Sequence, residues 1–175
     1  CQAWVEDYYT TGEVLHKGYY EDGRLTLYKN FYPNGNPERS FRRIDMEKCN
    51  MQLFYDTGKM KSDITYYEGT QLIWTDFYPS GQMEFTEEYL KGGEILVNRK
   101  AFAENGKPQE IFEMTDKKKK IYSKKEYYDN GNLKAEGNVI YNSNLGDYQK
   151  DGKWTVYDEQ GHPSTEQWIR GEQQK

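Results

Sequence analysis

Residues 74–83, Trp-Thr-Asp-Phe-Tyr-Pro-Ser-Gly-Gln-Met, contain the pattern that decides the fold. An aromatic-rich run meets Pro79-Ser80-Gly81, and a second run then continues through Tyr89. This arrangement is typical of a β-hairpin whose type I turn is followed by a residue in the left-handed conformation. Phe77 precedes Gly81 by four positions, and the same spacing occurs elsewhere in the chain.

The spacing of an aromatic residue and a glycine four positions later recurs along the chain. The pairs are Tyr8/Gly12, Phe31/Gly35, Phe54/Gly58, Phe77/Gly81, Phe102/Gly106, Tyr127/Gly131 and Tyr157/Gly161. Their glycines are 23, 23, 23, 25, 25 and 30 residues apart, and a period in this range indicates an array of similar supersecondary units. We predict that these glycines are structural turn residues, because glycine has no Cβ to clash at positive φ.

A second set of turn signals follows each glycine by about 11 residues, clearest at Asp22-Gly23, Glu68-Gly69, Gly92-Gly93 and Arg170-Gly171. Each repeat therefore contains two short strands and two turns. We predict an all-β fold, with about seven antiparallel hairpins in one long, twisted meander sheet. A single repeat domain is expected at 8–171, an N-terminal anchor or cap segment at 1–7 and a C-terminal tail at 172–175. Extra residues around 117–120 and 142–150 are predicted to lie between strands.

The first strand of each repeat contains two candidate surfaces. The aromatic residue four positions before the glycine is expected to face the core, and the tyrosine after it to point the other way. These tyrosines are Tyr9, Tyr32, Tyr55, Tyr78 and Tyr128. They are our candidate binding surface, because tyrosine combines rigid contact area with a hydrogen-bonding tip. Alternatively, their rings pack over neighbouring strands and shield the sheet.

Seven residues before their glycines, Trp74 and Trp154 occupy the position that Tyr28 and Met51 hold in earlier repeats. We interpret this position as a packing position. Only 35% of the chain is hydrophobic and the mean hydropathy is −1.14, whereas 16% is aromatic. A thin layer packed by large rings is therefore expected in place of a deep core.

The number and distribution of charged residues limit the classes of partner that the protein can bind. The net charge is −5, from 24 basic and 29 acidic residues scattered through all repeats, which argues against a nucleic-acid footprint. The sequence contains no run of 18 apolar residues of the kind that forms a membrane-spanning helix.

The sequence offers little catalytic chemistry. The two histidines, His16 and His162, stand at different offsets from their glycines, so they are not expected to converge. A serine nucleophile elbow, an HExxH motif, a Walker loop and paired CxxC motifs are all missing from the sequence. We therefore predict a non-enzymatic protein with no catalytic residue, no metal site and no cofactor.

The chain opens on Cys1, as a bacterial lipoprotein does after removal of its signal peptide. This predicts lipidation of Cys1 and a location in the bacterial cell envelope, with membrane contact only through that lipid. The alternative is an arbitrary boundary at Cys1 and a cytoplasmic location.

Two segments of the chain resemble a known repeat. Residues 127–137, Tyr-Tyr-Asp-Asn-Gly-Asn-Leu-Lys-Ala-Glu-Gly, and residues 150–161, Lys-Asp-Gly-Lys-Trp-Thr-Val-Tyr-Asp-Glu-Gln-Gly, resemble the variant MORN repeat. That repeat is found in bacterial proteins often called YwqK-family antitoxins. The resemblance implies a hairpin array and carries over turn glycines and packing aromatics, but no catalytic residue. The antitoxin label implies neutralisation of a partner toxin by binding.

These observations favour a non-enzymatic binding or scaffold protein of the cell envelope that engages another protein or an envelope polymer through its hairpin surface. The first alternative is an antitoxin or immunity protein that binds a toxin. A second is a cell-wall array of the choline-binding kind. Such arrays need an aromatic cage with tryptophan in nearly every repeat, and this chain has only 4 tryptophans.

Overall fold

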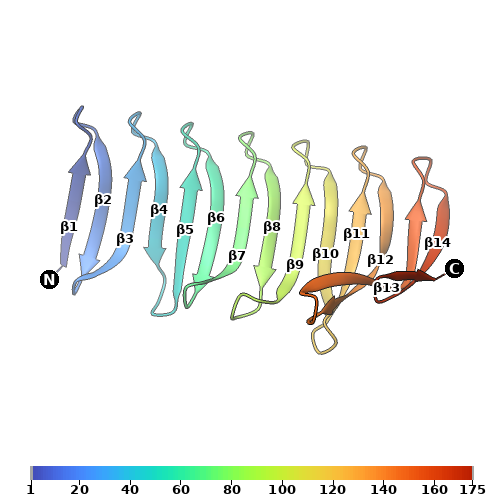
Figure 1. Cartoon of the computed structure of the whole chain (residues 1–175). Coiled ribbons are helices and arrows are strands. Elements are labelled where there is room, and N and C mark those ends of the chain that lie inside the picture. Colours follow the sequence, from blue (N-terminus) through green and yellow to red (C-terminus); the bar gives the residue numbers. More distant parts are fainter. Residues whose placement is uncertain (1, 175) are drawn as a thin grey trace. The chain divides into compact units, whose positions relative to one another are not determined.

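The computed structural model describes residues 2–174, which form β-strands and no helix. The first eight strands are β1 (Gln2–Tyr8), β2 (Val14–Glu21), β3 (Arg24–Phe31), β4 (Pro37–Arg43), β5 (Lys48–Phe54), β6 (Met60–Tyr67), β7 (Thr70–Phe77) and β8 (Met83–Tyr89). The others are β9 (Leu96–Phe102), β10 (Pro108–Asp116), β11 (Ile121–Tyr127), β12 (Leu133–Asn142), β13 (Asp147–Tyr157), β14 (Pro163–Ile169) and β15 (Glu172–Gln174). Their order in the sheet is their order in the sequence (Figure 1). The predicted all-β array of antiparallel hairpins is confirmed.

The glycine turns share one geometry, which the turn after β3 illustrates. The N–H of Gly35 donates to the carbonyl of Tyr32 (2.8 Å), and the N–H of Tyr32 donates to the carbonyl of Asn36 (2.8 Å). Gly35 has φ +84°, and the strand register shifts beside the turn, between Asn30 and Phe31. This is a type I turn closed by a glycine bulge.

The seven glycines expected at these turns all have positive φ. They are Gly12 (+100°), Gly35 (+84°), Gly58 (+83°), Gly81 (+96°), Gly106 (+80°), Gly131 (+89°) and Gly161 (+87°). Each lies between two consecutive strands, and its N–H donates to the carbonyl three residues earlier. Their role is therefore to close the hairpin turns.

The turns at the other ends of the strands include two-residue turns in which both residues have positive φ. Asp22 and Gly23 have φ of 48° and 76°, and Glu68 and Gly69 have φ of 47° and 80°. Such type I′ turns match the twist of the paired strands, which explains the glycine in second place.

The two ends of the described chain form strands. Residues 2–7 belong to β1, which pairs with β2, and residues 172–174 form β15, which pairs with β14. The expected cap and tail are therefore strands, because each follows or precedes a hairpin turn and completes a ladder. Cys1 and Lys175 lie outside the described residues. The described chain divides into two compact units.

Of the described residues, the first unit comprises 2–84 and 88–95, and the second comprises 85–87 and 96–174. A repeat array can divide in this way because each repeat contacts only its neighbours.

Of the extra residues near 142–150, residues 143–146 form a turn between strands, as predicted, and the others lie within strands. They lengthen β12 and β13 to 10 and 11 residues. Gly137 pairs with Trp154, but Asn138 pairs with Asp151, so Gly152 and Lys153 have no partner on β12. Gly152 has φ +78° at this bulge. We call residues 138–151 beyond the bulge the arm. Figure 1 shows the arm turning across the direction of the neighbouring strands, as bulges allow.

The buried residues lie elsewhere than expected. The aromatic residues four positions before the glycines are half-buried or exposed. In the second unit the buried hydrophobic side chains are Leu96, Phe112, Tyr122, Ala135, Val139 and Trp154. Val139 lies in the arm itself, and Leu96, Phe112 and Trp154 line a cavity together with Val139 and Tyr148 of the arm, so the arm covers part of this single sheet layer.

Candidate functional site

The tyrosine row predicted as a binding surface makes a repeated contact between neighbouring repeats. The hydroxyl groups of Tyr9, Tyr32 and Tyr55 donate to the backbone carbonyls of Phe31 (2.7 Å), Phe54 (2.9 Å) and Phe77 (2.8 Å). In the second unit, the Tyr128 hydroxyl donates to the carbonyl of Tyr157 (2.8 Å). Tyr78, the fifth member, is half-buried like the others. Each of the four bonds joins one glycine turn to the next, which favours the interpretation that the rings pack the sheet.

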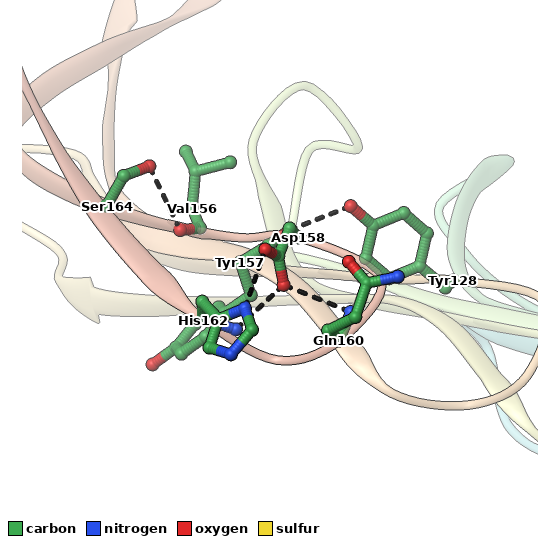
Figure 2. A network of polar contacts seen from close by, with 7 residues as sticks. All are labelled: Tyr128, Val156, Tyr157, Asp158, Gln160, His162 and Ser164. Carbon is green, nitrogen blue, oxygen red and sulfur yellow. Dashed lines mark hydrogen bonds and ion pairs between the residues drawn. The ribbon is translucent and has the colours of Figure 1, made fainter.

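The last glycine turn contains His162, and Figure 2 shows its surroundings. The carboxylate of Asp158 accepts hydrogen bonds from the backbone N–H groups of His162 (2.8 Å) and Gln160 (3.0 Å), and its second oxygen lies 2.9 Å from Nδ1 of His162. The backbone N–H of His162 and then its ring lower the pKa of Asp158. His16 instead contacts Asn30 in the first unit (2.7 Å). The polar contacts of the Asp158 carboxylate are therefore made within its own turn.

A row of directly paired residues crosses the strands of each unit. In the first unit the cross-strand partners run in the order Val5, Gly18, Tyr28, Phe41, Met51, Ile64 and Trp74. This row contains no charged side chain.

The second unit contains the corresponding row, which we call the central row. Its members, from β9 to β13, are Arg99, Phe112, Lys124, Gly137 and Trp154. Arg99 and Lys124 stand seven residues before their turn glycines, the position held by Tyr28, Met51, Trp74 and Trp154 in other repeats. Two packing positions therefore hold cations, and both lie in the unit that has the arm.

The arm packs an aromatic side chain onto this unit. The ring of Tyr148 meets Phe112 edge-on (82°, 4.9 Å between centroids) and Tyr122 edge-on (90°, 5.0 Å). Phe112 and Tyr122 are themselves stacked at 4.7 Å. Tyr122 is fully buried and Phe112 is 5% exposed, so the arm closes a small aromatic core over β10 and β11. Burial raises the pKa of both the Tyr122 and Tyr148 hydroxyls, which stay protonated at neutral pH.

A cavity of about 250 Å³ lies next to this aromatic core. Its apolar lining comes from Leu96, Phe112, Val139 and Trp154. Its polar lining comes from Arg99, Glu110, Lys124, Asp147, Tyr148 and Lys150. The strands of the sheet and the arm thus both contribute side chains to the cavity lining. The lining combines apolar side chains with several groups that can form hydrogen bonds.

The charges at the cavity are arranged in pairs. Lys124 Nζ lies 2.8 Å from a carboxylate oxygen of Glu126 and 3.1 Å from one of Glu110. Burial disfavours the Lys124 ammonium, but these carboxylates outweigh it and raise the pKa of Lys124. Burial likewise opposes the charge on Glu126, yet Lys124 lowers the pKa of Glu126 overall. Lys124 and Glu126 are therefore both ionised at neutral pH.

Two further cations border the cavity. The Arg99 guanidinium is paired with Glu87, with Nε 2.6 Å from the carboxylate. Lys150 Nζ lies 4.2 Å from the ring centroid of Trp154 and 3.6 Å from a carboxylate oxygen of Glu166. Each cation is therefore held in place before a ligand arrives, which reduces the entropic cost of binding.

Sequence reasoning did not find this site. A signal was present, since Arg99 and Lys124 are charged at a position where other repeats hold large apolar residues, and since the cavity lies beside the longest insertion. Among the described residues, no group of three or more His, Cys, Asp or Glu side chains is placed to hold a metal ion. Nor does any helix within 2–174 have the length and hydropathy to cross a membrane.

The fold and this site define a β-hairpin repeat protein with one modified region. Residues 123–140, which lie on β11, its glycine turn and β12, match the MORN repeat variant. The chain therefore contains a MORN-type repeat. No curated protein matches the chain in sequence.

Two solved structures resemble part of the chain. One is the crystal structure of TarM (TM-score 0.37, 12% identity), which covers 62% of this chain and 19% of that one. The other is a point mutant of S. aureus TarM in complex with Fondaparinux, alpha-GlcNAc-glycerol and UDP (TM-score 0.37, 11% identity, 63% and 20% covered). The matched region spans about a fifth of the length of either TarM chain.

Proposed function

We propose that this chain is a non-enzymatic binding protein of the repeat type, and that its binding site is the arm-covered cavity of the second unit. The MORN-type repeat supports the general class, because such arrays present extended surfaces. The observation that carries the location is the replacement of apolar residues by Arg99 and Lys124 in the central row. Both cations are paired with carboxylates, Arg99 with Glu87 and Lys124 with Glu110 and Glu126, so the cavity is bordered by charged groups at positions where other repeats hold large packing side chains.

The tyrosine row is a weaker candidate. Four of its hydroxyl groups already donate to backbone carbonyls, so a partner would have to compete with those bonds. The cavity, in contrast, combines an apolar wall with ionised groups at its border, the composition common to ligand sites.

The test is affinity capture from a cell-envelope extract with three forms of the full chain. The first is wild type and the second is Glu110→Gln with Lys124→Met, which alters the cavity without changing net charge. The third is Lys100→Met with Glu113→Gln, which removes an ion pair (2.9 Å) from the neighbouring strands β9 and β10 outside the cavity lining. We expect the same partner on wild type and the third form but not on the second. Equal capture by all three forms would refute this location.

The identity of the captured partner distinguishes the scaffold proposal from the antitoxin alternative. An envelope protein or polymer fits the scaffold proposal, whereas a toxin whose activity the chain neutralises fits the antitoxin alternative of the YwqK-type resemblance. Attachment through a lipid on Cys1 stays a prediction, and mass spectrometry of the native protein for an acylated Cys1 is the measurement that checks it.

A further inference from the structure

The chemistry of the cavity restricts the kind of ligand it can take, and this inference rests on the proposed binding function. The cavity is smaller than the roughly 300–1,000 Å³ of sites for drug-sized molecules. A ligand must therefore be small, or enter with one small group.

The charged side chains that line the cavity are of both signs, with Arg99, Lys124 and Lys150 positive and Glu110 and Asp147 negative. An anion placed beside Lys124 or Lys150 would also approach the carboxylates of Glu110 and Asp147. A cation placed beside those carboxylates would approach the ammonium groups in turn. An ion of either sign therefore meets repulsion as well as attraction in this small volume.

A purely apolar ligand fits no better. It would displace water from ionised side chains and offer no hydrogen bond in return, which costs free energy. A ligand that carries both donors and acceptors avoids this cost, because an ammonium group can only donate and an ionised carboxylate can only accept.

The apolar wall adds the last restriction. Leu96, Phe112 and Val139 line the cavity and are 3–5% exposed, so each contributes only a small hydrocarbon surface to it. They suit a ring with C–H groups on one side and hydroxyl groups around its edge. A neutral sugar ring has this distribution, since its hydroxyl groups both donate and accept.

We propose that the cavity binds one neutral sugar residue, with the remaining N–H of Lys124 Nζ donating to one of its hydroxyl oxygens and the Glu110 carboxylate accepting from one of its hydroxyl groups. Tyr148 closes the site from the arm. The source is either a free sugar or one residue of an envelope polymer, and both present the same ring to the cavity.

The experiment is ligand-observed NMR followed by calorimetric titration of the full chain. The neutral probes are glucose, galactose, mannose and their N-acetylamino forms, each as a monosaccharide and as a short oligomer. Glucuronic acid and glucosamine serve as charged counterparts. The proteins are wild type, Glu110→Gln with Lys124→Met, and Lys100→Met with Glu113→Gln, each checked for folding by thermal unfolding.

We expect at least one neutral sugar to bind wild type and the Lys100/Glu113 variant equally, and the Glu110/Lys124 variant roughly tenfold or more weakly, because bonds to charged groups are lost. Tighter binding of the oligomer would identify a polymer, and equal binding a free sugar or chain end. The sugar proposal is overturned if no neutral probe binds, if a charged counterpart binds more tightly, or if the Glu110/Lys124 variant binds like wild type. If capture from the extract still depends on Glu110 and Lys124, the cavity remains the binding site and only the ligand class is wrong.

Discussion

Trp154 packs directly against the backbone of Gly137, its partner on the neighbouring strand. A Cβ added to Gly137 would lie 2.5–2.6 Å from three atoms of the indole ring. The indole Nε1 donates to the carbonyl of Asn138 (2.8 Å), and the side chain of Trp154 is fully buried. Lys150 lies against the same ring, so this contact links β12 and β13 where the arm begins.

Gly137→Ala should therefore destabilise the protein, although alanine usually suits a strand better than glycine. The indole and backbone cannot separate without disturbing the buried core, and overpacking of this kind costs about 1–3 kcal/mol. Urea unfolding measures the loss. Asn138→Ala, at the exposed next residue, is the control and should cost much less. A Gly137→Ala protein as stable as wild type would contradict this packing.

The tyrosine hydroxyl bonds give a second prediction. Changing Tyr9, Tyr32 and Tyr55 together to phenylalanine removes three hydroxyl groups that bridge neighbouring repeats, at about 0.5–1.5 kcal/mol each. We expect a lower free energy of unfolding and unchanged capture of the partner. Tyr8→Phe is the matched control, because the Tyr8 hydroxyl donates to the exposed side chain of Glu6 on its own strand. Loss of partner with normal stability would instead make the row a recognition surface.

The glycine turns can be tested at Gly81, which has φ +96°. Valine at this position should cost about 1–3 kcal/mol, because a β-branched side chain is strained at positive φ. Gln82→Val beside it should have little effect. Similar losses from the two substitutions, measured by thermal unfolding, would show that strain at Gly81 is not what limits stability.

The Lys124 pair predicts a dependence of stability on pH. Because the folded state lowers the pKa of Glu126, its contribution is present above the ordinary glutamate pKa of about 4.3 and is lost as pH falls through the folded value. Wild type should therefore lose stability below about pH 4 more steeply than Glu126→Gln. Urea unfolding at about pH 7, 4 and 3 measures the difference, with Glu113→Gln as the control. Parallel pH profiles for wild type and Glu126→Gln would contradict the lowered pKa.

Local signals made the hairpin array predictable. A glycine at positive φ, four residues after an aromatic residue, specifies its turn within a few residues, as at Gly35 and Gly81. The hydroxyl bond of Tyr32 could not be foreseen, because its acceptor lies 22 residues away on the next repeat. The sequence did not predict the arm for a related reason. Its direction depends on the bulge at Gly152 and on the contact of Tyr148 with Phe112, which local patterns do not encode.

The central claim is that partners bind at the arm-covered cavity. Amide hydrogen–deuterium exchange of the full chain, with and without the partner captured from the envelope extract, tests it most directly. We predict slower exchange on binding in β9, β10, β11 and the arm at 138–151, with little change in the glycine turns. Protection confined to the turns that carry Tyr9, Tyr32 and Tyr55, with unchanged exchange in the arm, would contradict the claim.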